Sequence, residues 1–156
     1  MTAGDGGRAC EYFFHILNNP GDEISFWVAG KALSDSETDW HKHLSSSVEE
    51  LYGTTNRSAV EGLSDIFTRA EDAYLRHLPS FRSGTISIEP LDEDHAGPPV
   101  YITKRLATAQ RRQYGDELKS IALDLRKLSP NVPEKKRMQN ISRCVENVIA
   151  DLSNAS

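Results

Sequence analysis

Residues 106–128 read LATAQRRQYGDELKSIALDLRKL, and this stretch decides the fold class. Its mostly apolar residues recur every three or four positions, which is the spacing of one face of an α-helix. The stripe consists of Leu106, Gln110, Tyr114, Leu118, Ile121, Leu125 and Leu128. Thr103 is a suitable cap, so the pattern predicts a long helix from Thr103 to Leu128. Gly115 interrupts the stripe and suggests a bend or break there.

A second helix is predicted directly after this one. Residues 129–133 read SPNVP, a turn in which Asn131 is a candidate cap and Pro133 fits a first helical turn. The stripe that follows is spaced by three and four residues and consists of Met138, Ile141, Val145, Val148 and Leu152. We therefore predict that the last two helices form an antiparallel hairpin.

Two further helices are predicted upstream. Ser36 with Asp39, and Ser58 with Glu61, have the three-residue spacing of capping boxes. The first helix carries Trp40, Leu44, Val48, Leu51 and Tyr52 up to Gly53. The second carries Leu63, Ile66, Phe67, Ala70, Tyr74 and Leu78 and ends at Pro79.

The N-terminal part has a shorter pattern. Between Arg8 and Asn18, helical spacing is shown by Ala9, Tyr12, Phe13, Ile16 and Leu17. Asn18, Asn19, Pro20 and Gly21 end that helix. Residues 22–33 favour another helix, although the compact run from Ile24 to Val28 also fits a buried strand.

Only one region departs from helical periodicity. Residues 85–89 (TISIE) alternate like a strand, and residues 100–103 offer a second short β-like run. The whole chain of 156 residues is thus expected to be a mainly α-helical single domain, a bundle of five or six helices with one small β-hairpin-like excursion around 85–103. Residues 1–7 are expected to be flexible, and residues 90–99 to form an acidic mobile loop.

A core follows from these stripes. We expect burial of Phe13, Trp27, Trp40, Leu44, Phe67, Tyr74, Leu118, Ile121, Leu125, Ile141, Val145 and Val148. The two cysteines, Cys10 and Cys144, are expected to be buried thiols, because the chain lacks a signal peptide and a cytoplasmic or nuclear location follows. No stretch is apolar enough to insert into a membrane.

Charge is divided unevenly along the chain. Residues 1–98 carry a net charge of −10 and residues 99–156 a net charge of +5. The basic residues form a candidate binding surface: Lys104, Arg105, Arg111, Arg112, Lys135, Lys136 and Arg137. Such clustering suits nucleic acid, but the acidic chain as a whole favours salt bridges between the two parts or a solvated face. Asp92, Glu93 and Asp94 form a candidate acidic binding loop.

Catalytic and cofactor motifs are absent from the sequence. Trp40-His-Lys-His43 places two histidines about 200° apart on a helix, so they cannot share a metal ion there, and both are expected to be solvated. We predict no catalytic residues, no metal and no cofactor. The function predicted is a non-catalytic protein-interaction or regulatory module with another protein as partner, and the alternative is nucleic-acid binding through the basic C-terminal third.

One stretch is similar to a known family. Residues 24–33, ISFWVAGKAL, resemble the F-W-x-A helix of regulator-of-G-protein-signalling domains. Within Phe14 to Ser83, the runs 14–17, 51–52, 67–70 and 79–83 follow in the order that this family uses. The resemblance implies an all-helical bundle that binds a Gα subunit and accelerates GTP hydrolysis. The asparagine with which that family contacts Gα has no clear counterpart here.

Overall fold

The computed structural model describes residues 20–35, 39–77 and 106–154. This part of the chain contains five α-helices and a short 3₁₀ turn: α1 (Pro20–Ser34), α2 (Trp40–Tyr52), α3 (Arg57–His77), α6 (Thr108–Leu128), η2 (Ser129–Asn131) and α7 (Lys135–Asn154). No strand occurs among the described residues. The mainly helical fold is therefore confirmed, and residues 22–33 form a helix rather than a strand. The predicted helix at 8–18, the excursion at 85–103 and the predicted mobile segments lie outside the described residues.

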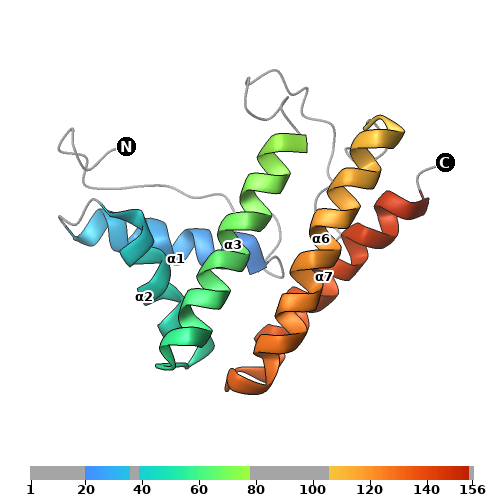
Figure 1. The fold of residues 1–156 in the computed structure, drawn as a ribbon. Coiled ribbons are helices and arrows are strands. Elements are labelled where there is room, and N and C mark those ends of the chain that lie inside the picture. Colours follow the sequence, from blue (N-terminus) through green and yellow to red (C-terminus); the bar gives the residue numbers. More distant parts are fainter. Residues whose placement is uncertain (1–19, 36–38, 78–105, 155–156) are drawn as a thin grey trace.

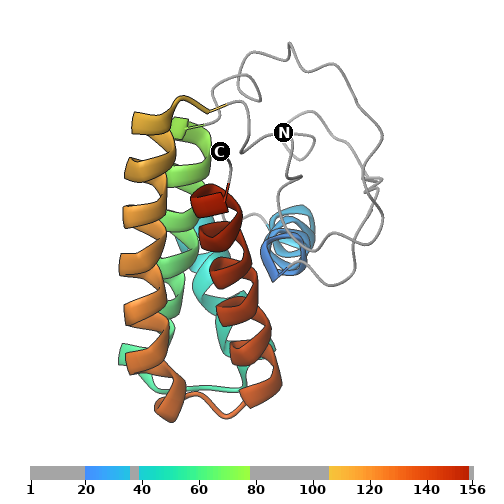
Figure 2. The ribbon, with the colours of Figure 1, turned by 90° about the vertical axis from the view of Figure 1, so that its right-hand side faces the viewer.

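Three long helices form the body of the molecule. α3 runs upward, α6 returns beside it and α7 runs upward again, so that neighbours are antiparallel (Figure 1). The hairpin predicted for α6 and α7 is present. α1 lies crosswise to these three helices and is seen end-on when they stand upright (Figure 2). It contacts α2 and α7. No helix in the described part is long and apolar enough to cross a membrane.

The core lies where the predicted stripes meet. On α6, Tyr114, Leu118, Ile121 and Leu125 are buried, whereas Gln110 is exposed. The facing residues are also buried and include Leu44, Val48, Leu63, Ile66, Met138, Ile141, Val148 and Leu152. Phe67, Tyr74 and Val145 are partly buried against this core. The periodicity of the sequence thus identified the inner face of each long helix.

Two predicted core residues are instead on the surface. Trp27 is 39% exposed and Trp40 is 45% exposed. Trp40 belongs to the same stripe as Leu44, but it is the first residue of α2, and helical side chains lean towards the N-terminus, beyond the end of the packed region. Trp27 is exposed because α1 meets the bundle through Ile24 and Val28. Phe13 lies outside the described residues.

The helix starts differ from those predicted. Asp39, not Ser36, caps α2, because its carboxylate accepts a hydrogen bond from the His41 N–H at 3.0 Å. Ser58 lies inside α3, and Asn56 Oδ1 accepts from the Ala59 N–H at 3.2 Å instead. α6 starts at Thr108, five residues after the predicted cap Thr103.

The hydrogen bonds at these helix starts differ between helices. At α2 and α3 a short polar side chain next to the first free N–H groups accepts their hydrogen bonds. The N-cap residue of α6 is Ala107, which has no capping side chain, and Gln110 Oε1 accepts a hydrogen bond from the Ala107 N–H at 3.1 Å. At the last helix, Asn131 belongs to η2 and Pro133 precedes the first residue of α7, so neither has its predicted place.

Glycines inside the helices give a first stability prediction. α6 is continuous through Gly115, so the predicted break is absent, and a Cβ atom at this position would meet nothing within 4 Å. Gly115→Ala should therefore raise the free energy of unfolding by up to about 1 kcal/mol through helix propensity. A Cβ atom at Gly62 would lie 2.8 Å from Leu128 Cδ1, so Gly62→Ala should bring no such gain. Chemical denaturation of both variants checks this contrast, and equal stabilisation would contradict it.

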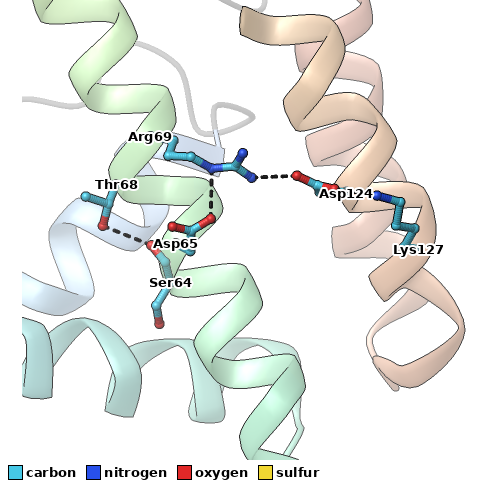
Figure 3. A network of polar contacts seen from close by, with 6 residues as sticks. All are labelled: Ser64, Asp65, Thr68, Arg69, Asp124 and Lys127. Carbon is cyan, nitrogen blue, oxygen red and sulfur yellow. Dashed lines mark hydrogen bonds and ion pairs between the residues drawn. The ribbon is translucent and has the colours of Figure 1, made fainter.

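A polar network joins α3 to α6. Arg69 donates from Nη2 to Asp124 Oδ2 at 2.8 Å and pairs through Nε with Asp65 Oδ2 at 2.8 Å (Figure 3). Lys127 Nζ adds a bond to Asp124 Oδ1 at 2.9 Å. The hydrogen bonds from Lys127 and Arg69 lower the pKa of Asp124. The first part of the chain thus supplies a cation and the second part an anion, opposite to the net charges of the two parts.

This network predicts a pH dependence. A carboxyl group whose pKa is lower in the folded chain stabilises the fold above its unfolded pKa of about 3.9, and that contribution disappears as the pH falls through the folded value. Asp124→Asn should therefore lower the free energy of unfolding by about 0.5–1 kcal/mol at neutral pH. The difference from wild type should shrink as the pH falls below the unfolded pKa and vanish once the pH is below the lowered pKa of Asp124 in the folded chain. Asp72→Asn, at an exposed site on α3, is the control, and an Asp124 effect that persists at low pH would refute the assignment.

Candidate interaction surface

α1 presents large apolar side chains to solvent. Phe26 is 47% exposed, Trp27 39% and Leu33 39%. At about 100° per residue, these three positions span roughly 120° of the helix surface, centred on Gly30. We call Phe26, Trp27 and Leu33 the α1 face.

The other side of α1 is also apolar. Ile24 is 5% exposed and belongs to the core, and Val28 packs against the core. An amphipathic helix at a protein surface normally has one apolar side, whereas α1 has two. The bundle therefore covers one side of α1 and leaves the α1 face exposed.

Ion pairs hold α1 in place near both of its ends. Lys31 pairs with Glu50 of α2, and Glu23 Oε1 lies 3.0 Å from Arg137 Nη2 of α7. Arg137 also donates from Nε to the Leu51 carbonyl at 2.8 Å. Arg137 thus links α1, α2 and α7, and the α1 face rests on an anchored helix.

A further exposed aromatic residue lies near the end of α1. Trp40, the first residue of α2, stacks on His41 with ring centroids 3.7 Å apart. The end of α1 and the start of α2 lie together at one side of the molecule (Figure 1). Trp40 therefore extends the set of exposed aromatic side chains beyond Leu33.

The stretch of sequence that contains the α1 face is acidic. Residues 20–52 hold seven acidic residues and two lysines, a net charge of −5. Lys31 is paired with Glu50 within this region. This stretch of the chain thus combines exposed apolar side chains on α1 with a net negative charge.

The predicted basic residues do not gather in one place. Arg111 and Arg112 stand at the start of α6, whereas Lys135, Lys136 and Arg137 stand at the start of α7. These two helix starts lie at opposite ends of the antiparallel pair (Figure 1). From residue 111 to residue 128, α6 rises by about 25 Å. Lys104 and Arg105, like the acidic loop of Asp92, Glu93 and Asp94, lie outside the described residues.

Most described members of the basic set have partners within the fold. Arg111 donates to Thr108 Oγ1 at 3.3 Å. Lys135 donates to the carbonyl oxygens of Ser129 and Pro130 at 2.6 and 3.2 Å. Lys119, on the same side of α6 as Arg112, donates a hydrogen bond to Asp116. This hydrogen bond is the main cause that lowers the pKa of the Asp116 carboxyl group, and the charge of Arg112 lowers it further. Acidic residues thus partly neutralise the basic side of α6.

The two histidines of α2 differ in burial. His41 is exposed as predicted, but His43 is only 5% exposed, so the prediction of two solvated histidines is wrong. His43 occupies the inner side of α2 next to Leu44. Among the described residues, no group of three His, Cys, Asp or Glu side chains is placed to hold a metal ion.

The structure also forms a polar cluster that sequence reasoning missed. His77, 3% exposed, lies with Nε2 3.1 Å from Glu117 Oε1, and its ring stacks on Tyr114. Arg76 donates from Nη1 to both Glu117 oxygens at 3.0 Å. Burial raises the pKa of Tyr114. Because these residues lie about 40 positions apart in sequence, no local spacing connects them.

A shallow groove opens beside this cluster. It has a volume of about 860 Å³ and is lined, among described residues, by side chains of α6 alone, including Arg112, Asp116, Glu117 and Ser120. Catalytic sites need a nucleophile or base and a group that orients it, converging on one point. The described lining residues all come from α6, and the contacts of Arg76 and His77 with Glu117 join α3 to α6.

Comparisons with known proteins found no matching family model, no matching curated protein and no matching solved structure.

Proposed function

We propose that this chain is a non-catalytic protein-interaction module that binds a basic amphipathic helix of a partner protein through the α1 face and Trp40. The observation that carries the proposal is the exposure of Phe26, Trp27 and Leu33 on a helix whose other side is already buried in the core.

Aromatic side chains are effective binding residues. Trp, Tyr and Phe are enriched at the centres of protein interfaces, because each buries a large area while losing little conformational freedom. Phe26 and Trp27 are adjacent on α1, and the helix that holds them is fixed by Lys31 and Glu23. A fixed helix supports binding, since little further ordering is required.

The charge of the region selects the partner. An apolar helix face bordered by negative charge favours an amphipathic helix bordered by Lys and Arg. The net charge of −5 over residues 20–52 supplies that border. Binding should accordingly weaken as salt rises, because exposed charges are screened.

Selection from displayed peptide libraries tests the proposal. Two libraries of helical peptides share randomised apolar positions and differ only in Lys/Arg or Asp/Glu on the outer side. We expect binders from the basic library, and we expect Phe26→Ala with Leu33→Ala to weaken them at least tenfold, about 1.4 kcal/mol. Leu123→Ala is the matched control, because Leu123 is also exposed (55%) but lies on α6. An absence of basic binders, or binders that tolerate the double change in a folded chain, would refute the proposal.

Two other readings predict different results. Nucleic-acid binding through the basic C-terminal third predicts affinity for RNA or DNA that falls steeply with salt and is lost when Arg105, Arg111 and Arg112 become glutamine. The resemblance to regulators of G-protein signalling stays a prediction that no comparison tests. It predicts faster GTP hydrolysis by a Gα subunit.

A further inference from the structure

We propose that the partner helix bound by the α1 face is α6 of a second copy of this chain. This inference rests on the proposed function and names the partner. The α1 face calls for an exposed apolar residue surrounded by positive charge, and the outer side of α6 offers both.

Leu123 supplies the apolar residue. It is 55% exposed, and the other large apolar side chains exposed in the described part of the chain are Phe26, Trp27, Leu33 and Trp40. Leu123 is thus the one such residue, among those described, that lies away from α1 and the start of α2. Contact between Leu123 of one copy and the aromatic side chains of another removes apolar area from water on both copies.

Cations surround Leu123 on α6. Lys119 lies four residues before it, and Arg126 and Lys127 lie three and four residues after it, so all three are its neighbours on the helix surface. We call Leu123 and these three cations the α6 face. Each cation is exposed and pairs with a carboxylate of its own copy. Exposed ion pairs contribute little to stability, so these cations can exchange partners with carboxylates of another copy.

The tertiary structure makes the exposed side of α6 basic. Glu117 and Asp124 of α6 bind Arg76 and Arg69 of α3, and Figure 3 shows Asp124 directed towards Arg69. The exposed charged residues that remain on α6 are four cations and one aspartate, a net charge of +3. The α1 face lies within residues 20–52, whose net charge is −5. The two faces are complementary in charge, whereas two α1 faces would repel each other.

The two faces of one copy do not meet. In Figure 2, α6 stands on the left and α1 lies on the right, with α7 between them. Ion pairs to α2 and α7 hold α1 at its place. Contact between different surfaces of successive copies is therefore head-to-tail, and it continues into a ring or a row of copies.

Analytical ultracentrifugation of the full chain tests the inference. The mean mass should rise above that of the monomer between about 1 and 200 µM protein, and it should fall again when salt is raised from about 50 to 500 mM. Leu123→Asp should stay monomeric, and so should Phe26→Ala with Leu33→Ala. Ala109→Asp introduces the same charge at an exposed position about 21 Å along α6, so this matched control should associate like wild type. Far-UV circular dichroism checks that each variant is folded.

Mixing the variants identifies the surfaces that meet. The Leu123→Asp protein keeps its α1 face, and the double variant keeps its α6 face. An equal mixture should therefore form a complex of two copies and grow no further. A wild type that is monomeric at every concentration would overturn the inference. So would a wild type that associates while the mixture forms no complex, because the contact would then lie elsewhere.

These results separate the inference from the proposed function. If the chain stays monomeric but selected basic peptides bind and depend on Phe26 and Leu33, the proposed function stands and the inference fails. If the mixture forms its complex but no basic peptide is selected, the α1 face recognises α6 only within the folded chain. The inference then stands and the proposed function fails.

Discussion

Leu125→Ala is expected to lower the free energy of unfolding by about 2–5 kcal/mol. Leu125 is fully buried on α6, on the stripe that also buries Leu118 and Ile121. Replacing its isopropyl group by hydrogen loses the transfer free energy of the buried atoms and leaves a cavity where α6 meets its neighbours. Denaturant unfolding followed by far-UV circular dichroism measures the change.

The control for this prediction lies two residues away. Leu123 is on the same helix, is chemically identical and is 55% exposed, so Leu123→Ala should change stability by no more than about 0.5 kcal/mol. Similar losses at both positions would mean that α6 is rotated relative to the bundle.

Arg137→Ala is expected to cost about 1–3 kcal/mol. The guanidinium donates to the Leu51 carbonyl at 2.8 Å and pairs with Glu23 at 3.0 Å, so its removal leaves a carbonyl and a carboxylate on two different helices without this partner. Arg126, whose side chain is 67% exposed and pairs with Glu146, is the matched control. Arg126→Ala should lie within about 0.5 kcal/mol of wild type.

The same pair of variants separates two roles of Arg137. The sequence places Arg137 in a candidate basic binding surface, whereas the structure places it between α1, α2 and α7. A stable Arg137→Ala protein that loses affinity for an anionic partner would favour the binding role. A destabilised protein favours the structural one.

Much of the fold could be predicted from local pattern. Apolar spacing identified α2, α3, α6 and α7 and their inner faces, because a helix that packs on a core must repeat its apolar residues near every 3.6 positions. The prediction was weaker for α1, where apolar residues occur on both sides. When both sides of a helix carry apolar residues, the spacing of those residues does not show which side packs against the core.

The helix ends were less predictable. Ser36, Ser58 and Thr103 have suitable side chains, yet α2 and α3 begin with the caps Asp39 and Asn56, and α6 begins at Thr108. Several residues in a short window can cap a helix, and their intrinsic preferences differ by only about 1 kcal/mol or less. Tertiary packing decides where the helix starts when competing caps are so similar.

The candidate surface depends on the same distinction. The amino-acid sequence by itself determined that the chain is helical, that α6 and α7 return on each other and that the stripe of α6 is buried, since these properties follow from the spacing of neighbouring residues. Only the tertiary structure decided that Trp27 and Trp40 remain exposed, that Arg137 links three helices and that His77 meets Glu117. These outcomes depend on how α1 and the bundle are arranged in space, and contacts between residues 40 or more positions apart leave no local pattern in a single sequence.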